Sequence, residues 1–386
     1  MKLRLTREAL AEAVAWAAHA LPARSSAPAL SGLLLTAAQD GDGTLTVSGF
    51  DYEVSARFQA PAEVLESGSA LIPGRLLADL ARVLPSGGHH VELSAVGSDV
   101  ALVCGPVQFE LPVIPLEDYP RLPAAPAPRG TVDGALFAEA VAQVAVVAGR
   151  DEALPILTGI RLEFHARTLR LVATDRYRLA VRELPWARAA PASDEEPVVA
   201  MVPARSLHEI ARSLTKGERI AISHAPEEGG GHGPGGLIGF AAGSREATTR
   251  LLAADFIRYE AVFPSSRTGS ALVERAPLLD AVKRIALVTE RHQPLRLSFS
   301  PGRVVVDAGG GSEARGRQTL DARFDAEPIV LASNAGYLVD GLSAIGTRFV
   351  ELSYTTPTKP AVLTGREDAE LPDDSYRYLF MPLRAG

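Results

Sequence analysis

The segment best suited to chemistry is a short polar stretch between two apolar runs, Val172–Val181 (VATDRYRLAV). It places one carboxylate, Asp175, beside the guanidinium groups of Arg176 and Arg178. One interpretation is an enzyme in which an acid and two cations surround a substrate. The other is a β-hairpin in which Asp175 accepts hydrogen bonds from the amides of the turn, as aspartate often does. The rest of the chain offers no nucleophile–base pair, metal constellation or cofactor motif, so the sequence predicts that the protein is not an enzyme.

Two glycine-rich segments also attract notice, but neither matches a phosphate-binding motif. Gly229–Gly236 lacks the lysine and the strand-to-helix context of a P-loop, and we interpret it as a hairpin loop. Gly309–Ser312 stands between two strand-like runs, where a turn is needed. The eight histidines show no metal-ligand spacing such as HExxH. The sequence therefore predicts no metal site and no cofactor.

Composition indicates an ordinary globular protein. The 386 residues are 47% hydrophobic and 22% charged, with a formal net charge of −7. Cys104 is the only cysteine, so no internal disulfide can form, which suits a reducing compartment. The first residues lack the apolar core of a signal peptide, and no run approaches the ~20 apolar residues of a membrane span. We therefore expect a cytoplasmic protein.

The elements that must position the polar stretch occur three times along the chain. Helical periodicity predicts a first helix in each copy at Arg7–Leu21, Gly134–Ala148 and Arg275–Thr289. Matching phrases follow the first two helices, PALSGLLL at Pro28–Leu35 and PILTGIRL at Pro155–Leu162, and a shortened version, PLRL, follows the third. The copies are spaced by roughly 130 residues, which is one small domain and far too long for a solenoid repeat.

A second landmark repeats at nearly the same interval. A strand-like run leads into a second predicted helix at Gly74–Leu84, Ala204–Leu214 and Asn334–Leu342. Two unrelated landmarks that move together indicate a triplicated domain rather than chance similarity. A chain of this length is also expected to hold two to four domains.

Between the helices, the sequence alternates with the period of half-buried antiparallel strands. Thr6 follows the strand-like Leu3–Leu5 and stands where a helix N-cap belongs. The alternating runs are Thr44–Phe50, Val54–Phe58, Leu169–Ala173, Leu179–Arg182, Val304–Asp307 and Arg317–Leu320. Each domain is therefore predicted to be α+β, with two helices packed on antiparallel sheets.

Proline-rich and polar segments divide the three copies. Leu122–Gly130 and Val262–Gly269 read as linkers. The predicted domains are residues 1–125, 130–264 and 268–386.

The polar stretch resembles the Ala-Thr-Asp-x-x-Arg-Leu-Ala signature of the bacterial sliding clamps, the beta subunits of the replicative DNA polymerase III. The resemblance continues along the whole chain, at Met1–Leu3, Leu21–Arg24, Leu116–Pro120, Ala253–Phe256 and Tyr378–Arg384. Clamps of that family contain three topologically similar domains, in agreement with the triplication. Two crescent-shaped protomers join head to tail into a ring that encircles duplex DNA and tethers a polymerase, with helices lining the hole and sheets outside.

The resemblance also implies the partners. These are double-stranded DNA, bound without regard to sequence, a second copy of the chain, the replicative polymerase alpha subunit and the clamp loader. Repair polymerases, ligase or mismatch-repair proteins would bind through short peptides. No membrane partner is implied, and loading would need an ATP-driven loader.

The acidic net charge is unusual for a DNA-binding protein, because basic surfaces normally supply affinity for the duplex. A ring that encircles DNA does not need high affinity for it, so basic residues are required only on the surface that lines the hole. The resemblance favours Arg24 and Arg150, which occupy loops that approach DNA in the family. Arg75, Arg205 and Arg212 lie on predicted helices. An ordinary solvated charge is the alternative for each, and contacts to phosphates would carry no sequence information.

The resemblance further implies a docking pocket for short peptides where the second domain meets the third. Its residues are Leu157, Thr174, Arg176, Tyr177, Arg178, Leu179, Val262, Leu379, Phe380, Met381, Pro382, Leu383 and Arg384. A concave apolar surface would accept leucine and phenylalanine anchors, and Arg178 would fix their orientation. The alternative for Met381–Leu383 is a plain edge strand that closes the third sheet.

The chain departs from the common family pattern beside this pocket. Phe256 is followed by Ile257 where clamps often carry proline, and Ala261 stands where an arginine or another polar residue is frequent. These differences leave two other hypotheses open. One is a second clamp copy with altered peptide or ligand tolerance. The other is a non-replicative scaffold with the clamp fold.

Closing the ring requires a contact between the first domain of one copy and the third domain of the other. The resemblance places Phe109 and Leu111, on an edge strand, against Leu287 and Val288 at a helix end. Apolar residues on an exposed edge invite aggregation unless they are paired, which is consistent with an interface.

Overall fold

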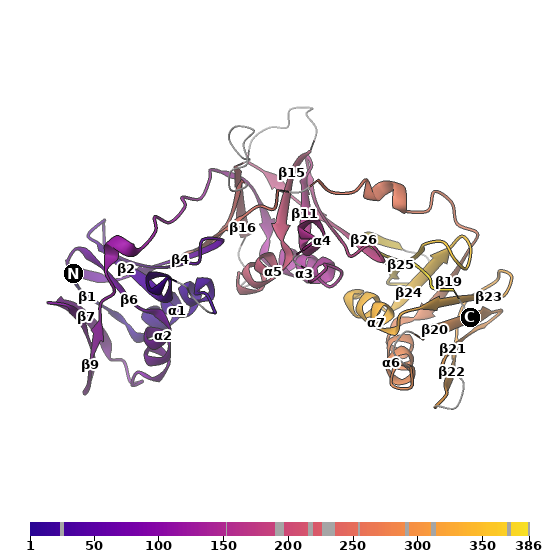
Figure 1. Ribbon diagram of the computed structural model, residues 1–386, viewed down its shortest axis with the longest axis horizontal. Helices are drawn as coiled ribbons and strands as arrows, with labels where there is room; N and C mark the ends of the chain where they lie inside the picture. Colours follow the sequence, from indigo (N-terminus) through magenta and orange to yellow (C-terminus); the bar gives the residue numbers. More distant parts are fainter. Residues whose placement is uncertain are drawn as a thin grey trace. The chain divides into compact units, whose positions relative to one another are not determined.

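A computed structural model describes residues 1–23, 27–151, 153–189, 197–214, 219–225, 236–253, 255–289, 293–309, 314–368 and 372–384. The chain forms two compact units, and Figure 1 traces its path through both. The first unit comprises Met1–Ala135, Arg188–Pro191 and Glu209–Leu251. The second comprises Leu136–Ala187, Ala192–His208 and Leu252–Gly386.

The first unit contains two complete helices, α1 (Arg7–Ala17) and α2 (Gly74–Val83), which pack beside each other. Its short 3₁₀ helices are Ala18–Ala20, Pro28–Ser31 and Leu116–Asp118. Its strands are β1 (Lys2–Thr6), β2 (Gly32–Ala38), β3 (Thr44–Phe50), β4 (Val54–Pro61), β5 (Glu63–Glu66), β6 (Gly68–Pro73), β7 (His90–Val96), β8 (Asp99–Cys104), β9 (Val107–Pro112), β10 (Pro128–Asp133), β16 (Arg219–Ala225), β17 (Leu237–Ala242) and β18 (Arg245–Arg250).

These strands form two antiparallel sheets. One has the order β5-β1-β7-β8-β9, and the other has the order β14-β10-β16-β17-β18-β4-β3-β2-β6, where β14 is Ala187–Arg188. Helix α1 begins where the sequence predicts, because the Thr6 side chain accepts a hydrogen bond from the Ala9 amide at 3.2 Å. It buries Leu10 and Val14 against the sheet and ends four residues before the predicted Leu21, the last turn being a 3₁₀ helix.

The second unit contains α3 (Gly134–Ala145, from its third residue), α4 (Pro155–Thr158), α6 (Arg275–Ala286), α7 (Ala335–Ala344) and the 3₁₀ helix Tyr259–Val262. Helix α5 (Ala204–Ser213) runs across the division between the units. The strands of the second unit are β11 (Gly159–Phe164), β12 (Thr168–Thr174), β13 (Arg178–Pro185), β15 (Val198–Pro203), β19 (Gly269–Glu274), β20 (Leu295–Ser300), β21 (Arg303–Ala308), β22 (Gly316–Asp321), β23 (Ile329–Ser333), β24 (Phe349–Tyr354), β25 (Ala361–Arg366) and β26 (Pro372–Phe380).

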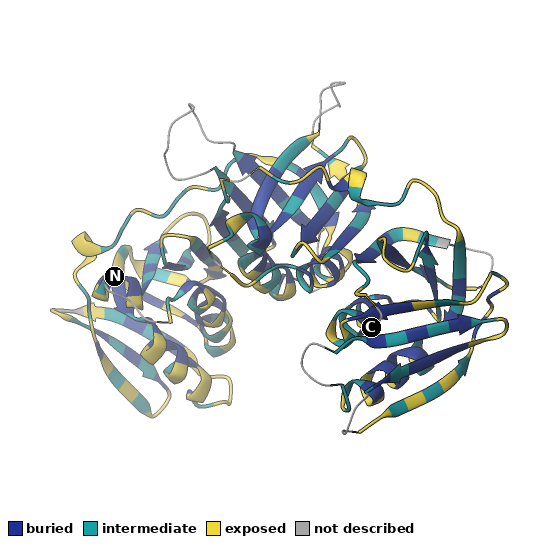
Figure 2. Cartoon of the chain, turned by 45° about the vertical axis from the view of Figure 1, so that its right-hand side comes forward, coloured by how far each residue is buried: buried dark blue, intermediate teal, exposed yellow. Residues whose placement is uncertain are grey.

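The second unit also has two antiparallel sheets. An eight-stranded sheet has the order β15-β11-β12-β13-β26-β25-β24-β19, and a four-stranded sheet has the order β22-β21-β20-β23. Helices α6 and α7 pack together, as α1 and α2 do. Colouring by burial shows alternating buried and exposed positions along the strands (Figure 2), which is typical of sheets with one face on a core.

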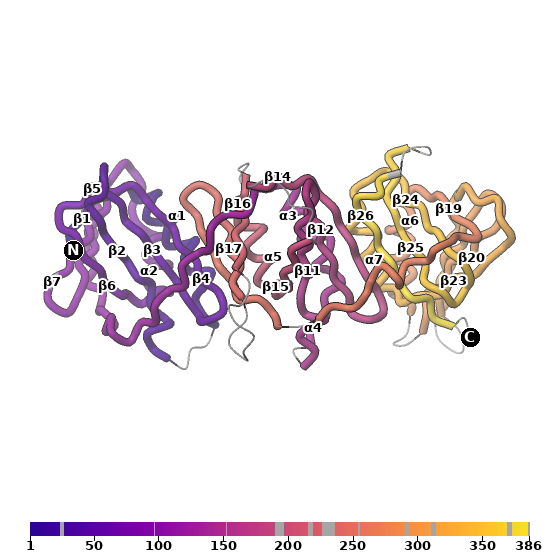
Figure 3. The backbone as a smooth tube through the Cα atoms, turned by 90° about the horizontal axis from the view of Figure 1, so that it is seen from above, coloured from indigo at the N-terminus to yellow at the C-terminus, as the bar shows by residue number. Residues whose placement is uncertain are grey.

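Each unit contains one joint at which strands from two different repeats pair. In the first unit β4 pairs with β18, and in the second β13 pairs with β26. Figure 3, which views the chain from above, labels β4 and β26. We call these ladders the first joint and the second joint. The second helix of each repeat and the predicted alternating strands are confirmed. Pro128–Gly130, which we expected in a linker, instead begins β10 and pairs with β16.

Two of the predicted loops lie largely outside the described residues. Gly229–Gly235 and residues 310–312 are not described, whereas Gly309 has a φ of +92°. Cys104 is buried and free.

Candidate functional site

The polar stretch forms a tight turn between β12 and β13. Asp175 Oδ1 accepts hydrogen bonds from the amides of Tyr177 and Arg178, both at 3.0 Å. The Thr174 hydroxyl donates to the carbonyl oxygen of Arg178 at 2.7 Å. Arg176 adopts a φ of +81°, a left-handed conformation that is uncommon for residues other than glycine. The hairpin interpretation of Asp175 is therefore confirmed.

Arg178 connects this turn to helix α7. Its guanidinium contacts Asp175 Oδ2 at 2.9 Å and Asp340 Oδ2 at 2.5 Å, and lies 4.5 Å from the ring centre of Tyr337. Burial alone would lower the pKa of Arg178, but hydrogen bonds to Asp340, Tyr378 and Asp175 raise it above the ordinary arginine value. The side chain is 11% exposed, so this charge is held in one geometry.

The C-terminal segment lies against the same turn. The Met381 amide donates to the Tyr177 carbonyl oxygen at 2.8 Å, and the Leu383 amide donates to the Ala332 carbonyl oxygen at 2.8 Å. Met381 and Pro382 are half-buried, whereas Leu383 is exposed. Tyr177 leaves 53% of its surface exposed. The turn and the tail therefore form one continuous surface of apolar side chains beside the Arg178 guanidinium.

An apolar cluster lies beneath this surface. Its buried members are Val172, Leu179, Val181, Tyr259, Val362 and Leu379. Phe256, Val262 and Phe263 pack against it and stay partly exposed. The segment before β19 is thus attached to the sheet and contributes apolar side chains to the surface.

A polar network fixes this segment in place. The Tyr259 hydroxyl donates to Glu163 Oε2 at 2.9 Å and accepts from Arg170 Nη1 at 3.0 Å. Burial would raise the pKa of Glu163, but hydrogen bonds from Arg161 and Tyr259 and the charges of Arg161 and Arg170 outweigh it, so the pKa is lowered. A buried carboxylate with these partners is fully satisfied.

The structure separates the expected pocket residues into two groups. Arg176, Tyr177, Leu383 and Arg384 are exposed, and Arg178, Val262, Met381 and Pro382 are partly exposed. The remaining five are buried and can only support the surface from below: Leu157, Thr174, Leu179, Leu379 and Phe380. Sequence reasoning missed Tyr337 and Asp340, because nothing local signals that α7 reaches Arg178.

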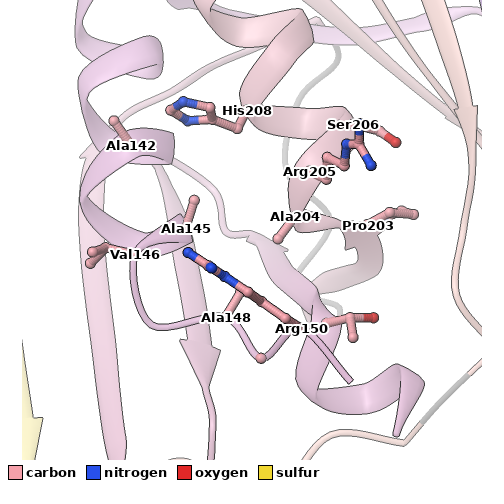
Figure 4. A pocket seen from close by; sticks show the side chains of 12 residues that line it. Ala142, Ala145, Val146, Ala148, Arg150, Pro203, Ala204, Arg205, Ser206 and His208 are labelled. Carbon is pink, nitrogen blue, oxygen red and sulfur yellow. The ribbon is translucent and has the colours of Figure 1, made fainter. Parts of the chain in front are cut away.

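Basic residues gather around a second feature, a pocket of about 760 Å³ between the end of α3 and the start of α5. Figure 4 shows Arg150 and Arg205 entering it from different walls, together with His208. Arg150 and Arg205 are exposed. Much of the remaining lining is small, including Ala142, Ala145, Ala148 and Ala204. The pocket therefore presents two exposed cations above a lining of small side chains, which suits an anionic backbone better than a specific small molecule.

The other expected DNA residues differ in setting. Arg75 is exposed, and its guanidinium donates to the carbonyl oxygens of Pro22 and Ala23 at 3.0 and 2.7 Å. Arg212 is exposed in the last turn of α5. Arg24 lies outside the described residues.

Comparison with known families covers nearly the whole chain. Residues 1–123, 131–257 and 260–384 match the N-terminal, central and C-terminal domains of the DNA polymerase III beta subunit. The chain belongs to this family. The predicted family and the α+β fold of three clamp domains are confirmed.

Beta sliding clamps from several bacteria resemble the chain over nearly their full length. The beta sliding clamp of Streptomyces coelicolor is 47% identical over 386 residues, covering 100% of this chain and 99% of that protein. The beta sliding clamp homolog GriR of Streptomyces muensis is 43% identical with the same coverage. The sliding clamp of Pseudomonas aeruginosa bound to griselimycin has a similar fold, with a TM-score of 0.88 at 24% identity, covering 100% and 99% of the two chains.

These similarities confirm the assignment as a DNA sliding clamp and do not favour the other two hypotheses. None of the helices in the described ranges combines the length and apolar character needed to cross a bilayer. Across the same described residues, no group of three or more His, Cys, Asp or Glu side chains is placed to hold a metal ion.

The chain has two sheet ends that bear on ring closure. Strand β9 ends the five-stranded sheet, and β22 ends the four-stranded sheet. On β9, Phe109 is half-buried, but Leu111 is only 2% exposed and packs within its own subunit. Beyond the end of α6, Leu287 is 86% exposed and Val288 is half-buried.

Proposed function

We propose that two copies of this chain close head to tail into a ring around duplex DNA, and that the ring tethers the replicative polymerase. The observation that carries this proposal is the repeated joint. In each joint, a strand that follows a polar turn (β4 or β13) pairs with the last strand of the next repeat (β18 or β26). In the third repeat the equivalent strand is β22, and in the first repeat the equivalent last strand is β9. Both are end strands, so a second copy can supply the missing partner.

In this proposal the first domain is residues 1–125, the second 130–264 and the third 268–386. Phe109, with support from Leu111, meets Leu287 and Val288 of the other copy at each of two interfaces. An exposed leucine at 86% beside an open strand edge is the kind of surface that an interface covers.

We propose that the DNA contacts are weak and directed at phosphates. Arg150 and Arg205 at the α3–α5 pocket are the first candidates, followed by Arg212 and Arg24. Arg75 is bound to loop carbonyls and would act mainly through its long-range charge. With a net charge of −7, the chain cannot rely on overall attraction to DNA, so encirclement supplies the retention.

We further propose that short peptides of the polymerase alpha subunit, the clamp loader and repair proteins dock on the surface of Arg176, Tyr177, Arg178, Val262 and the C-terminal segment. The partly exposed Met381 suits a surface that meets several partners, because its flexible side chain repacks at low cost. The protein then acts in the cytoplasm as a tether and without catalysis.

The test is to load the protein with a clamp loader and ATP onto nicked circular DNA, and then to linearise the circle. Retention on the circle and loss after cutting, measured by gel filtration, are expected for a topological ring. Equal retention before and after cutting would show attachment by contact and would overturn the proposal. A circle carrying a bound protein block at each side of the cut is the control, because a ring should then stay on the linear DNA.

A further inference from the structure

The two joints share one register, although their side chains differ. In the first joint Ala247 lies opposite Ala56, and in the second Tyr378 lies opposite Ala180. Ala56 and Ala180 are equivalent because their hairpin partners, Gly49 in β3 and Ala173 in β12, occupy the same place in their strands. The fold therefore joins repeats by a fixed alignment rather than by the particular residues.

The same alignment can be carried to the two end strands, given the proposed ring. In β21, Ala308 holds the place of Gly49 and Ala173, and it lies opposite Gly316. In β9, Phe109 holds the place of Ala247, since each is the third residue after its hairpin turn. The repeat thus sets Phe109 of one copy opposite Gly316 of the other. Antiparallel pairing then places Glu110 opposite Arg315 and Gln108 opposite Arg317.

The exposure pattern agrees with this alignment. Phe109 and Gly316 are both half-buried, whereas Glu110, Arg315 and Arg317 are all exposed. Directly opposed residues share a face of a sheet, so the partly buried faces meet and the exposed faces meet. A shift by one residue would set Phe109 against an arginine on the solvent face and would reverse every side chain.

The side chains that cover Gly316 are apolar, which suits an aromatic residue on the opposite strand. A Cβ at Gly316 would approach Ile285 Cδ1 and Val288 Cγ2, both at 2.8 Å. The side chains at the end of α6 thus lie over the backbone at Gly316 and leave little room for a side chain there. A ring on the opposite strand would lie against these apolar side chains, and Leu287 stands beside them with 86% of its surface exposed.

Charge complementarity identifies the partner. An ion pair at 3.5 Å joins the directly opposed Arg57 and Glu246 of the first joint. Arg317 holds the place of Arg57, and Arg315 lies two residues before it on the same face. In this register the carboxylate of Glu110 lies directly opposite the guanidinium of Arg315, and Arg317 is a more distant diagonal neighbour.

We propose that Glu110 of one copy pairs with Arg315 of the other, in the register that opposes Phe109 to Gly316, and that this pair selects a second copy of the same chain as the ring partner. This inference rests on the proposed ring and adds its register and its specificity. A clamp with a basic residue in place of Glu110 would be rejected by like-charge repulsion.

The experiment compares dimerisation of Glu110→Arg, Arg315→Glu and their equimolar mixture by sedimentation during serial dilution. Each variant alone carries like charges at both interfaces, and we expect the ring dissociation constant to rise about tenfold per interface, or roughly a hundredfold in total. In the mixed dimer one interface carries both substitutions and the other carries neither. The mixture should therefore return to within about threefold of the wild type.

Arg317→Glu is the register control, because Glu110 would face Arg317 if the strands slipped by two residues. Rescue of Glu110→Arg by Arg317→Glu in place of Arg315→Glu would overturn the register. Dimerisation of both single variants at wild-type strength would overturn the pair. A wild-type chain that stays monomeric would instead refute the ring itself. Should either reversal fail to fold, the milder Glu110→Gln and Arg315→Gln are used, and each should weaken the ring about threefold.

Discussion

The first joint and the second joint are built on the same ladder but filled differently. In the first, the hydroxyls of Ser55 and Thr248 meet at 2.7 Å in a buried position. In the second, the equivalent pair is Leu179 opposite Leu379, within an apolar cluster. The backbone alignment is therefore independent of side-chain polarity, and each joint could acquire its own surface.

The turns that precede the two joints show the same contrast. Asp51 Oδ1 accepts from the amides of Glu53 and Val54, just as Asp175 serves the turn before β13. Tyr52 has a φ of +75°, close to the value for Arg176. The residue that follows each turn differs, because Val54 holds this position in the first joint and Arg178 holds it in the second. The comparison indicates how a few side chains at one copy of a repeated fold could turn it into the proposed docking surface.

The largest expected effect falls on the first joint. Trp16 is 5% exposed, donates through Nε1 to the Glu246 carbonyl oxygen at 3.3 Å and lies beneath the Arg245 guanidinium. Trp16→Ala should lower the free energy of unfolding by about 3–5 kcal/mol, because it leaves a large cavity in the joint. Denaturant unfolding measures the loss. Peptide affinity at the second joint should stay unchanged, and a parallel loss of both would contradict the independence of the two joints.

Arg178→Val gives the second joint the residue found in the first. It removes the contacts with Asp175, Asp340 and Tyr337, so peptide affinity should fall by about 2–3 kcal/mol, or roughly 30–150-fold. Fluorescence anisotropy with a labelled clamp-binding peptide measures this change. Arg57→Val, which removes an arginine from the first joint, is the matched control and should bind the peptide normally. Equal binding by both variants would show that Arg178 is not part of the docking surface.

The two units should differ in how their stability depends on pH between 6.5 and 4. Burial and the nearby Arg129 lower the pKa of His224, in the first unit, to about 4. The unfolded chain takes up that proton near pH 6.5, so stability present above pH 6.5 falls by about 2 kcal/mol as the pH drops toward 4. His224→Gln should flatten this part of the profile. Glu163→Gln, in the second unit, should leave it unchanged, since the lowered pKa of Glu163 acts only below the ordinary glutamate range. Identical profiles for wild type and His224→Gln would refute the assignment.

The smallest effect concerns the segment that borders the second joint. Tyr259→Phe removes the hydroxyl between Glu163 and Arg170 and should cost about 1 kcal/mol of stability. Hydrogen exchange of residues 256–263 should increase, while exchange at the first joint should not. Tyr354→Phe, a tyrosine on β24 in the same unit, is the control. Unchanged exchange in residues 256–263 would show that the hydroxyl does not hold the segment.

Periodicity and caps were sufficient to predict the helices and the triplication, because these depend on local sequence. Thr6 is an example, since its side chain caps the helix that follows it directly. The surroundings of the proposed docking surface were harder to predict, because they depend on contacts between distant segments. Phe380 and Leu111 are buried because their side chains lie on the covered faces of their strands. The contact between Arg178 and Asp340 joins residues of two domains. No spacing rule signals such a contact.

The left-handed backbone at Arg176 makes this position unusual among the exposed residues of the proposed docking surface. A side chain there costs about 1 kcal/mol or more, a cost that glycine avoids. Arg176→Gly would therefore remove a cation and relax the turn in the same step. Elsewhere on the surface, truncating a side chain risks destabilising the strands and turn beneath it. Among the turn residues, Arg176 is the position where a substitution can change the surface presented to a partner and relieve backbone strain at the same time.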